Sequence, residues 1–165
     1  MNRRAMLTRW AAVAGAVALV AATTGLLGGC ADESASGPPH IEFGRDVCDE
    51  CHMIISEPRF AAAYRDASGE PFVFDDISDM LANIAGGGQP ADDMIWVHDY
   101  ETEEWLDAPA AWYVSGQIAT PMGGGIVAFA HEEEAQAFAD EREGEILTWA
   151  EVTALDLSST VHSAP

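Results

Sequence analysis

The sequence predicts an α+β fold in which two ββα-type units form one compact domain. The main indication is a strand-to-helix step that occurs twice, where the short apolar runs 72–74 and 127–129 lead directly into helical patterns. Turn residues between the short runs indicate antiparallel hairpins. With 165 residues, of which 48% are hydrophobic, the chain is long enough for one such domain preceded by a targeting segment.

The first unit is predicted to be a hairpin followed by a helix. The apolar runs 60–65 and 71–74 are separated by Asp, Ser and Gly residues that favour a tight turn. Asp75 or Asp76 then caps a helix whose apolar residues recur at i, i+3, i+4 and i+7, and glycines 86–88 end it.

The second unit is predicted to repeat this order of strands and a helix. Three glutamates follow His131, at the end of a helix where the dipole favours anions. The predicted elements are strands at 94–100 and 104–107, a short element at 110–114, a strand at 126–130, a helix from His131 and a strand at 146–149.

The N-terminus has the layout of an export signal. Residues 1–29 hold three arginines and no acid, followed by an apolar run too short to favour a membrane span. This segment ends in Leu27-Gly28-Gly29-Cys30, which resembles the lipobox of bacterial and archaeal lipoproteins, so Cys30 is expected to be lipidated. Arg3-Arg4 resembles a twin-arginine signal, and the general secretory route stays equally open. We expect residues 30–40 to tether the protein to the extracytoplasmic face of the membrane.

The charge of the chain excludes some partners. All 28 acidic residues follow residue 29, where four arginines and no lysine oppose them. Nucleic acid and anionic lipid surfaces are therefore not expected to bind this protein. An acid-rich, lysine-free surface is typical of halophiles, because salt screens its self-repulsion, and an acidic exported proteome is the other explanation.

The candidate site is the stretch Cys48-Asp49-Glu50-Cys51-His52-Met53. It places two thiols, an imidazole and a thioether within one turn, and soft sulfur with nitrogen selects copper(I) or zinc over hard cations. Met53 favours copper(I), since a thioether is a poor zinc ligand. Met122 lies between Pro121 and a run of glycines that together fix its position, so it could close the site, or it could be a hydrophobic plug.

Three other interpretations of the paired cysteines stay open. A structural zinc site needs four ligands, and without a second CxxC the remaining ones would be histidines. A thiol oxidoreductase would place the motif at a helix N-terminus, whereas Asp49 and Glu50 here disfavour a thiolate. A plain structural disulfide is the third. The histidines available to zinc are His40, His52, His98 and His131.

Several further motifs accompany the cysteines in a fixed order. They are Phe74-Asp75-Asp76, Asp99-Tyr100, Trp105 to Ala108, Trp112-Tyr113-Val114, Thr120-Pro121-Met122-Gly123 and Val127-Ala128-Phe129. Together with Cys48 to Met53, they resemble the NosL family of lipoproteins from about Gly44 to Trp149.

The resemblance implies a copper(I) chaperone that is not an enzyme and that supplies nitrous oxide reductase in denitrification. It also implies a fold of two ββα-type units akin to the organomercurial lyase MerB. Carried over by position, the family's metal ligands fall on Cys48, Cys51, Met53 and Met122. Family members often have glycine at the position of His52, so whether His52 joins the metal stays open.

We therefore expect a signal peptide at 1–29, a lipidated tether at 30–40, a NosL-like metal-binding domain at 41–157 and a flexible tail at 158–165. The partners would be the membrane and nitrous oxide reductase or its assembly machinery. A CxxC thiol-disulfide oxidoreductase and a zinc-stapled binding lipoprotein are the alternatives.

Overall fold

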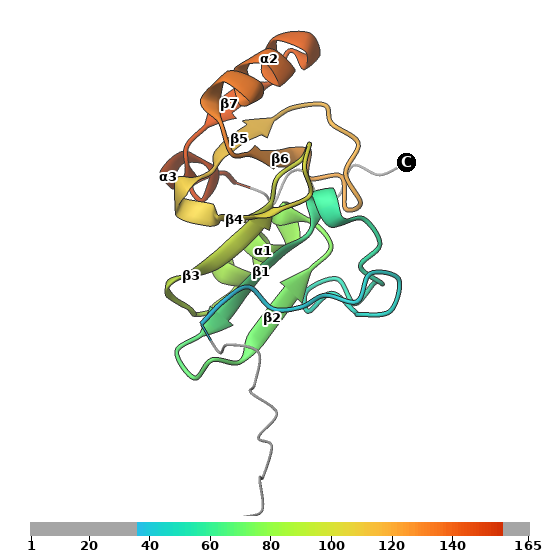
Figure 1. Ribbon diagram of the computed structural model, residues 1–165, viewed down its shortest axis with the longest axis vertical. Coiled ribbons are helices and arrows are strands. Elements are labelled where there is room, and N and C mark those ends of the chain that lie inside the picture. The colour runs from blue at the N-terminus through green and yellow to red at the C-terminus, as the bar shows by residue number, and fades with distance from the viewer. Residues whose placement is uncertain (1–35, 157–165) are drawn as a thin grey trace, which may run out of the picture. The chain divides into compact units, whose positions relative to one another are not determined.

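The computed structural model of the protein describes residues 36–156, which form two antiparallel sheets with helices packed on them (Figure 1). This arrangement confirms the predicted α+β fold. The expected signal peptide, the lipidation site Cys30 and the expected tail at 158–165 lie outside the described residues.

The first predicted ββα unit is present. Strand β1 (Ala62–Asp66) pairs antiparallel with β2 (Pro71–Phe74), and helix α1 (Ile77–Ala85) follows. Asp76 caps the helix by accepting a hydrogen bond from the backbone N–H of Ser78 at 2.8 Å. The hairpin and the helix cap are therefore both formed as the local sequence predicts.

Aromatic packing attaches α1 to this sheet. The ring of Tyr64 stacks on Phe72 and Phe74, with ring centroids 4.8 and 5.6 Å away. Its hydroxyl donates to the side chain of Asn83 in α1 at 2.7 Å. Tyr64 is almost completely buried, so one residue connects the sheet, the core and the helix.

The next hairpin joins the first sheet, so the prediction that it begins the second unit is wrong. Strands β3 (Pro90–His98) and β4 (Trp105–Asp107) extend that sheet in the order β2-β1-β3-β4. The reason is the position of β1, whose alanines are fully buried and whose second edge is open to a partner. Ala62 of β1 pairs with Val97 of β3 across that edge.

The second sheet has the order β6-β5-β7. Its strands alternate their side chains between two apolar layers. Tyr113 and Ala128 face the main core, whereas Val114, Val127 and Phe129 face a second core under α2. The elements of this part are the 3-10 turn η2 (Ala108–Ala110), β5 (Trp112–Ser115), β6 (Ile126–Phe129), α2 (Glu132–Arg142) and β7 (Glu145–Leu147).

Several element boundaries differ from the prediction, including the start of β3 at Pro90 rather than at 94, and two of the differences have a local cause. The run expected as a strand from residue 60 begins with the 3-10 turn η1 (Pro58–Phe60), because Pro58 starts a helical turn. The last strand was expected to run to residue 149, but α3 (Trp149–Val152) begins there. Thr148 and Glu151 form a capping box, which starts a helix at this position.

Asp99 joins the two sheets at the end of β3. Its carboxylate accepts the N–H of Ala130 at 2.7 Å, and the N–H of Tyr100 donates to the carbonyl of Ala128 at 2.8 Å.

Among residues 36–156, no helix has the length and hydrophobicity of a membrane span.

Candidate metal centre

The candidate site lies at the tip of a hairpin-like loop, residues 42–56, which we call the CxxC loop. The backbone N–H of Gly44 donates to the carbonyl of Ile55 at 2.8 Å, and the N–H of Ile55 donates to the carbonyl of Asp46 at 2.9 Å. The two arms of the loop therefore run side by side. The backbone N–H of Cys48 donates to the carbonyl of Met53 at 2.8 Å. The segment from Cys48 to Met53 is therefore a closed turn, as the sequence predicts.

Polar side chains fix the loop to the first unit. Asp49 exchanges two hydrogen bonds with Val73 of β2, at 2.9 Å through its N–H and 2.6 Å through its carboxylate. Asn83 of α1 donates to the Glu50 carboxylate at 3.0 Å. The two acids between the cysteines thus hold the loop in place through hydrogen bonds.

The two thiols lie together against a carboxylate of α1. The Cys48 thiol is buried and donates to Asp79 at 3.2 Å, while the N–H of Cys51 donates to the Cys48 sulfur at 3.5 Å. Cys51 is half-buried, and both cysteines are free thiols. Ligand atoms of Cys48, Cys51 and Asp79 all lie within 4.8 Å of one another, a spacing that could hold a metal ion.

Burial decides the protonation of these groups. It raises the pKa of the Cys48 thiol, and backbone N–H groups that favour the thiolate offset only part of this effect. Burial, followed by the Asp79 hydrogen bond, raises the pKa of the Cys51 thiol strongly. Burial likewise raises the pKa of Asp79. The expectation that a thiolate is disfavoured is confirmed, but burial and Asp79 cause it rather than Asp49 and Glu50.

Sequence reasoning missed Asp79. The residue lies in the first turn of α1 and is only 5% exposed, next to the apolar stripe that the sequence assigned to the core. A carboxylate on the buried side of an amphipathic helix was the signal that could have revealed it, since a buried carboxylate needs a partner.

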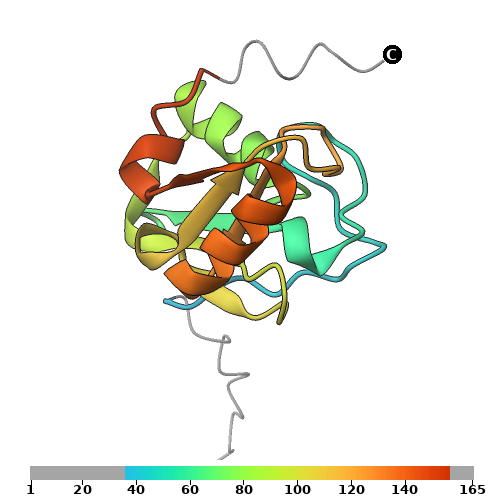
Figure 2. The same ribbon diagram turned by 90° about the horizontal axis from the view of Figure 1, so that it is seen from above.

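The start of α1 holds two other parts of the protein, the CxxC loop and the segment 116–125, through three carboxylates. Asp75 accepts the N–H of Ser56 at 3.0 Å, at the end of the CxxC loop, and Asp79 accepts the Cys48 thiol. Asp76 accepts the N–H of Met122 at 3.1 Å. The segment 116–125 therefore lies beside the start of α1, as both views show (Figures 1 and 2). Met122 makes this contact with its main chain, so its role as a ligand stays a prediction.

Met53 and His52 both lie on the surface of the turn. The Met53 side chain is 56% exposed, so it is not a packing residue of the core. His52 is exposed and has a φ of 61°, the left-handed region that favours glycine. Glycine would adopt this backbone conformation without strain, so the position has a structural preference that does not depend on metal binding.

The other histidines lie apart from the thiol cluster, which contains no histidine among residues 36–156. His98 is buried, hydrogen-bonds the carbonyl of Ala61 through Nδ1 at 3.1 Å and lies against Trp105 with the ring planes tilted by 33°, and burial lowers its pKa. His131 precedes α2. The structure thus does not bring together the cysteine-histidine set that a structural zinc site requires.

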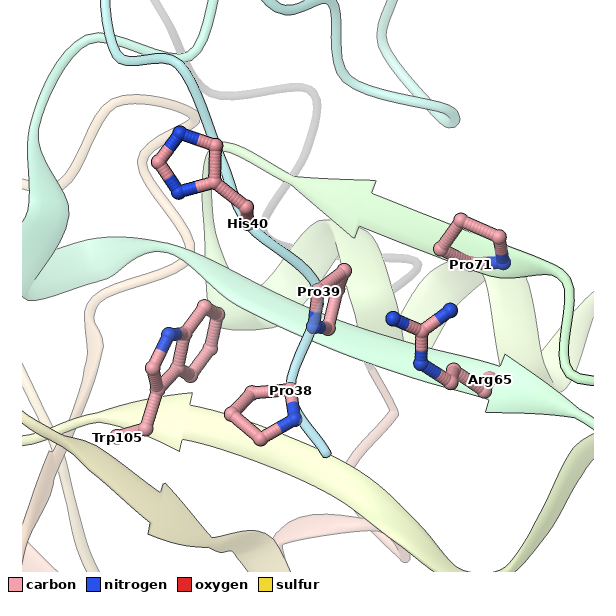
Figure 3. A pocket seen from close by; sticks show the side chains of 6 residues that line it. All are labelled: Pro38, Pro39, His40, Arg65, Pro71 and Trp105. Carbon is pink, nitrogen blue, oxygen red and sulfur yellow. The ribbon is translucent and has the colours of Figure 1, made fainter. Parts of the chain in front are cut away.

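His40 lines a different pocket, of about 450 Å³, between the first described residues and the outer face of the first sheet (Figure 3). Arg65 closes one side of it and donates to the carbonyls of Gly37 and Gly69, both at 2.9 Å. The last residues of the expected tether are therefore packed on the domain. The pocket contains no residue of the predicted metal site.

Comparison with known proteins decides the family. A family model described as NosL matches residues 41–156. The chain belongs to the NosL family. The crystal structure of the copper chaperone NosL from Shewanella denitrificans is similar with a TM-score of 0.62 and 21% identity, over 72% of this chain and 97% of that chain. No curated protein matches the sequence. The predicted resemblance is thus confirmed, and the structural likeness confirms the NosL fold.

Proposed function

We propose that this NosL protein is a copper(I) metallochaperone that holds one ion through Cys51 and Met53, with Cys48 completing the site. The observation that carries the proposal is the exposure of Met53, which belongs to the same closed turn as two free thiols and follows Cys51 by two residues. A methionine in this setting has no packing role, and thiolate with thioether is a ligand set that selects copper(I).

Asp79 serves the thiols in this proposal. A carboxylate oxygen is a poor ligand for a soft ion, so Asp79 is assigned to position the protonated Cys48 thiol in the metal-free protein through their hydrogen bond. The same carboxylate would suit zinc, which accepts cysteine and carboxylate ligands together. Comparing copper(I) with zinc is therefore the decisive experiment.

Exposure of the ligands suits a carrier rather than an enzyme. Met53 is exposed and Cys51 half-buried, so a ligand of an acceptor protein can reach the ion while Cys48 holds it from the buried side. Transfer by ligand exchange needs no catalytic group. The rival oxidoreductase function is less favoured, because raised thiol pKa values keep attacking thiolates scarce.

The acceptor and the location are part of the same proposal. We infer that the chain is exported, lipidated at Cys30 and held at the extracytoplasmic face of the membrane, where it supplies copper for the assembly of nitrous oxide reductase. Support comes from the export signal and lipobox of the sequence and from membership of the NosL family.

Anaerobic titration of residues 36–165 with copper(I) and with zinc, each against a competing chelator, tests the ligand set. We expect tight one-to-one copper(I) binding that falls at least about tenfold in Cys51→Ser and in Met53→Leu. Met94→Leu, at a partly buried methionine of β3, is the matched control and should bind as the wild type does.

Asp79→Asn separates the two metals, because it keeps an oxygen acceptor for the thiol and removes the charge. We expect it to change copper(I) affinity little and to weaken zinc binding. Zinc binding stronger than copper(I) binding, with a large loss in Asp79→Asn, would replace the copper proposal by a zinc site.

A further inference from the structure

The CxxC loop that carries the thiols also exposes large apolar side chains, which we call the apolar rim, and of these only Met53 belongs to the proposed ligand set. Among the described residues, the large hydrophobic side chains classed as exposed are Phe43, Val47, Met53 and Ile54, at 36, 50, 56 and 54% exposure. All four belong to the CxxC loop. Val47 and Ile54 stand opposite each other across a backbone bridge, a pairing that places their side chains on one face.

This concentration of apolar residues calls for an explanation. Elsewhere in the described domain, large hydrophobic side chains are at least partly buried, in a chain whose net charge is strongly negative. Metal binding accounts for the exposure of Met53, but exposing the other three side chains on the same loop is unfavourable unless another surface covers them. The rim therefore indicates an interface.

The charges of the loop indicate what covers it. Residues 42–56 contain four acids and one arginine, and that arginine, Arg45, pairs with Glu42 at 2.8 Å. Two of the acids, Asp49 and Glu50, are held in place by hydrogen bonds to Val73 and Asn83. A partner must therefore bring positive charge to the border of an apolar surface.

This charge excludes two other occupants. A second copy of the chain would place the acids of one loop against those of the other, within two domains that each carry a large acidic excess. An anionic lipid surface would be repelled for the same reason.

We propose that the apolar rim is the docking surface for a copper-accepting protein that presents an apolar recess bordered by arginine or lysine. The proposal rests on the chaperone function proposed above. Docking covers Val47 and Ile54, and it brings the acceptor's ligands to Cys51 and Met53 at the tip of the same loop.

Site-specific photo-crosslinking in cells identifies the occupant. The full-length protein would carry p-benzoylphenylalanine at position 47 and, as the control, at Glu133 on the exposed face of α2. We expect an adduct with one other protein at position 47 and none at position 133. Adducts with lipid only, with a second copy only, at both positions alike, or at neither would overturn the proposal.

Copper(I) transfer from the loaded full-length protein to the crosslinked partner completes the test. The double variant Val47→Thr/Ile54→Thr keeps the branched shape and reduces the apolar surface, so transfer should slow at least about tenfold. Transfer to a small copper(I) chelator is the control and should not change. An unchanged rate to the protein partner would contradict the docking surface.

The outcomes also separate this inference from the function on which it rests. Failure of the wild type to bind copper(I) would refute the chaperone function, while the crosslinks would still decide what covers the rim. If the double variant also changed transfer to the chelator, the single variant Val47→Thr would repeat the comparison. Raised salt should slow transfer to the partner more than transfer to an uncharged chelator.

Discussion

Position 52 can be explained in two ways, by its backbone conformation or by metal binding through the imidazole of His52. Its φ of 61° is unfavourable for a residue with a side chain, so the position has a structural reason to be glycine. The imidazole is also next to two thiol-bearing residues and could be taken for a ligand. Its exposure and its absence from the thiol cluster favour the backbone explanation.

We predict that His52→Gly stabilises the metal-free protein by about 0.5–1 kcal/mol and leaves copper(I) affinity within about twofold. Urea unfolding and the chelator titration measure the two effects. Glu143→Gly, at another left-handed position with a φ of 52°, shows the backbone effect alone. A tenfold loss of copper(I) affinity in His52→Gly alone would make the imidazole a ligand.

The thiols make copper(I) uptake depend on pH. Because burial raises the pKa of both thiols, each is protonated at neutral pH, and an ion that binds a thiolate must release its proton. Lower pH therefore weakens binding. Between pH 8 and 6 we predict that copper(I) affinity falls about tenfold for each unit by which the pH is lowered, for each cysteine that ligates.

The slope of this pH dependence counts the ligating thiols. Two protons released per ion would show that Cys48 binds together with Cys51, and one would show that a single thiol binds. Repeating the titration with Cys48→Ser identifies which one. Affinity that did not change with pH would contradict thiolate binding.

At the scale of elements, the start of α1 organises the site. Asp75 and Asp79 hold the CxxC loop, and Asp76 holds the segment 116–125, which approaches α1 closely at Gly124. A Cβ at Gly124 would overlap the side chain of Ser78. The contact between the two halves thus depends on a residue without a side chain.

We predict that Gly124→Ala lowers the free energy of unfolding by about 2–3 kcal/mol, because Ser78 in α1 has no room to move away. Gly123→Ala is the matched control. A Cβ there meets nothing within 4 Å and strains only its φ of 72°, which should cost about 1 kcal/mol. Equal effects in chemical denaturation would show that the close contact is not important.

Local sequence predicted most of the elements because their determinants are local. The α1 cap at Asp76 and the hairpin turn between β1 and β2 depend on neighbouring residues, and both formed as expected. The pairing of β3 with β1 connects residues 24 to 35 positions apart, and hydrophobic pattern alone does not choose between the two sheets. The capping box at Thr148 was visible in the sequence, but the apolar run before it favoured a strand.

The site was predictable to the same degree. Cys48, Cys51 and Met53 are neighbours in sequence, and the turn that brings them together is local. Asp79 reaches Cys48 across 31 positions, so only the fold could reveal that contact. The position of Met122 beside α1 likewise depends on how the segment 116–125 packs on the first unit.

At the scale of the whole domain, Asp99 holds the two sheets together. Burial alone would raise its pKa, but hydrogen bonds from Thr102, Ala130 and Glu101 outweigh burial and lower the pKa. A lowered pKa in the folded state means that the stabilisation is complete above the unfolded carboxyl's pKa of about 3.9. It is then lost as the pH falls through the lower folded value.

We predict that Asp99→Ala lowers the free energy of unfolding at neutral pH by about 3 kcal/mol, because several backbone N–H groups lose their acceptor. The variant should also lose less stability than the wild type as the pH falls below 4. Asp92→Ala, at an exposed position of β3, should cost less than about 0.5 kcal/mol. If acid destabilised Asp99→Ala as steeply as the wild type, this assignment would be wrong.

The central claim is that sulfur of two kinds at the tip of one loop holds copper(I). X-ray absorption spectroscopy at the copper edge, on the anaerobically loaded protein, tests it most directly. We predict a low-coordinate copper(I) ion with a first shell dominated by sulfur, which loses one sulfur scatterer in Met53→Leu and another in Cys51→Ser. A first shell dominated by nitrogen or oxygen, or a spectrum that Met53→Leu leaves unchanged, would contradict the account.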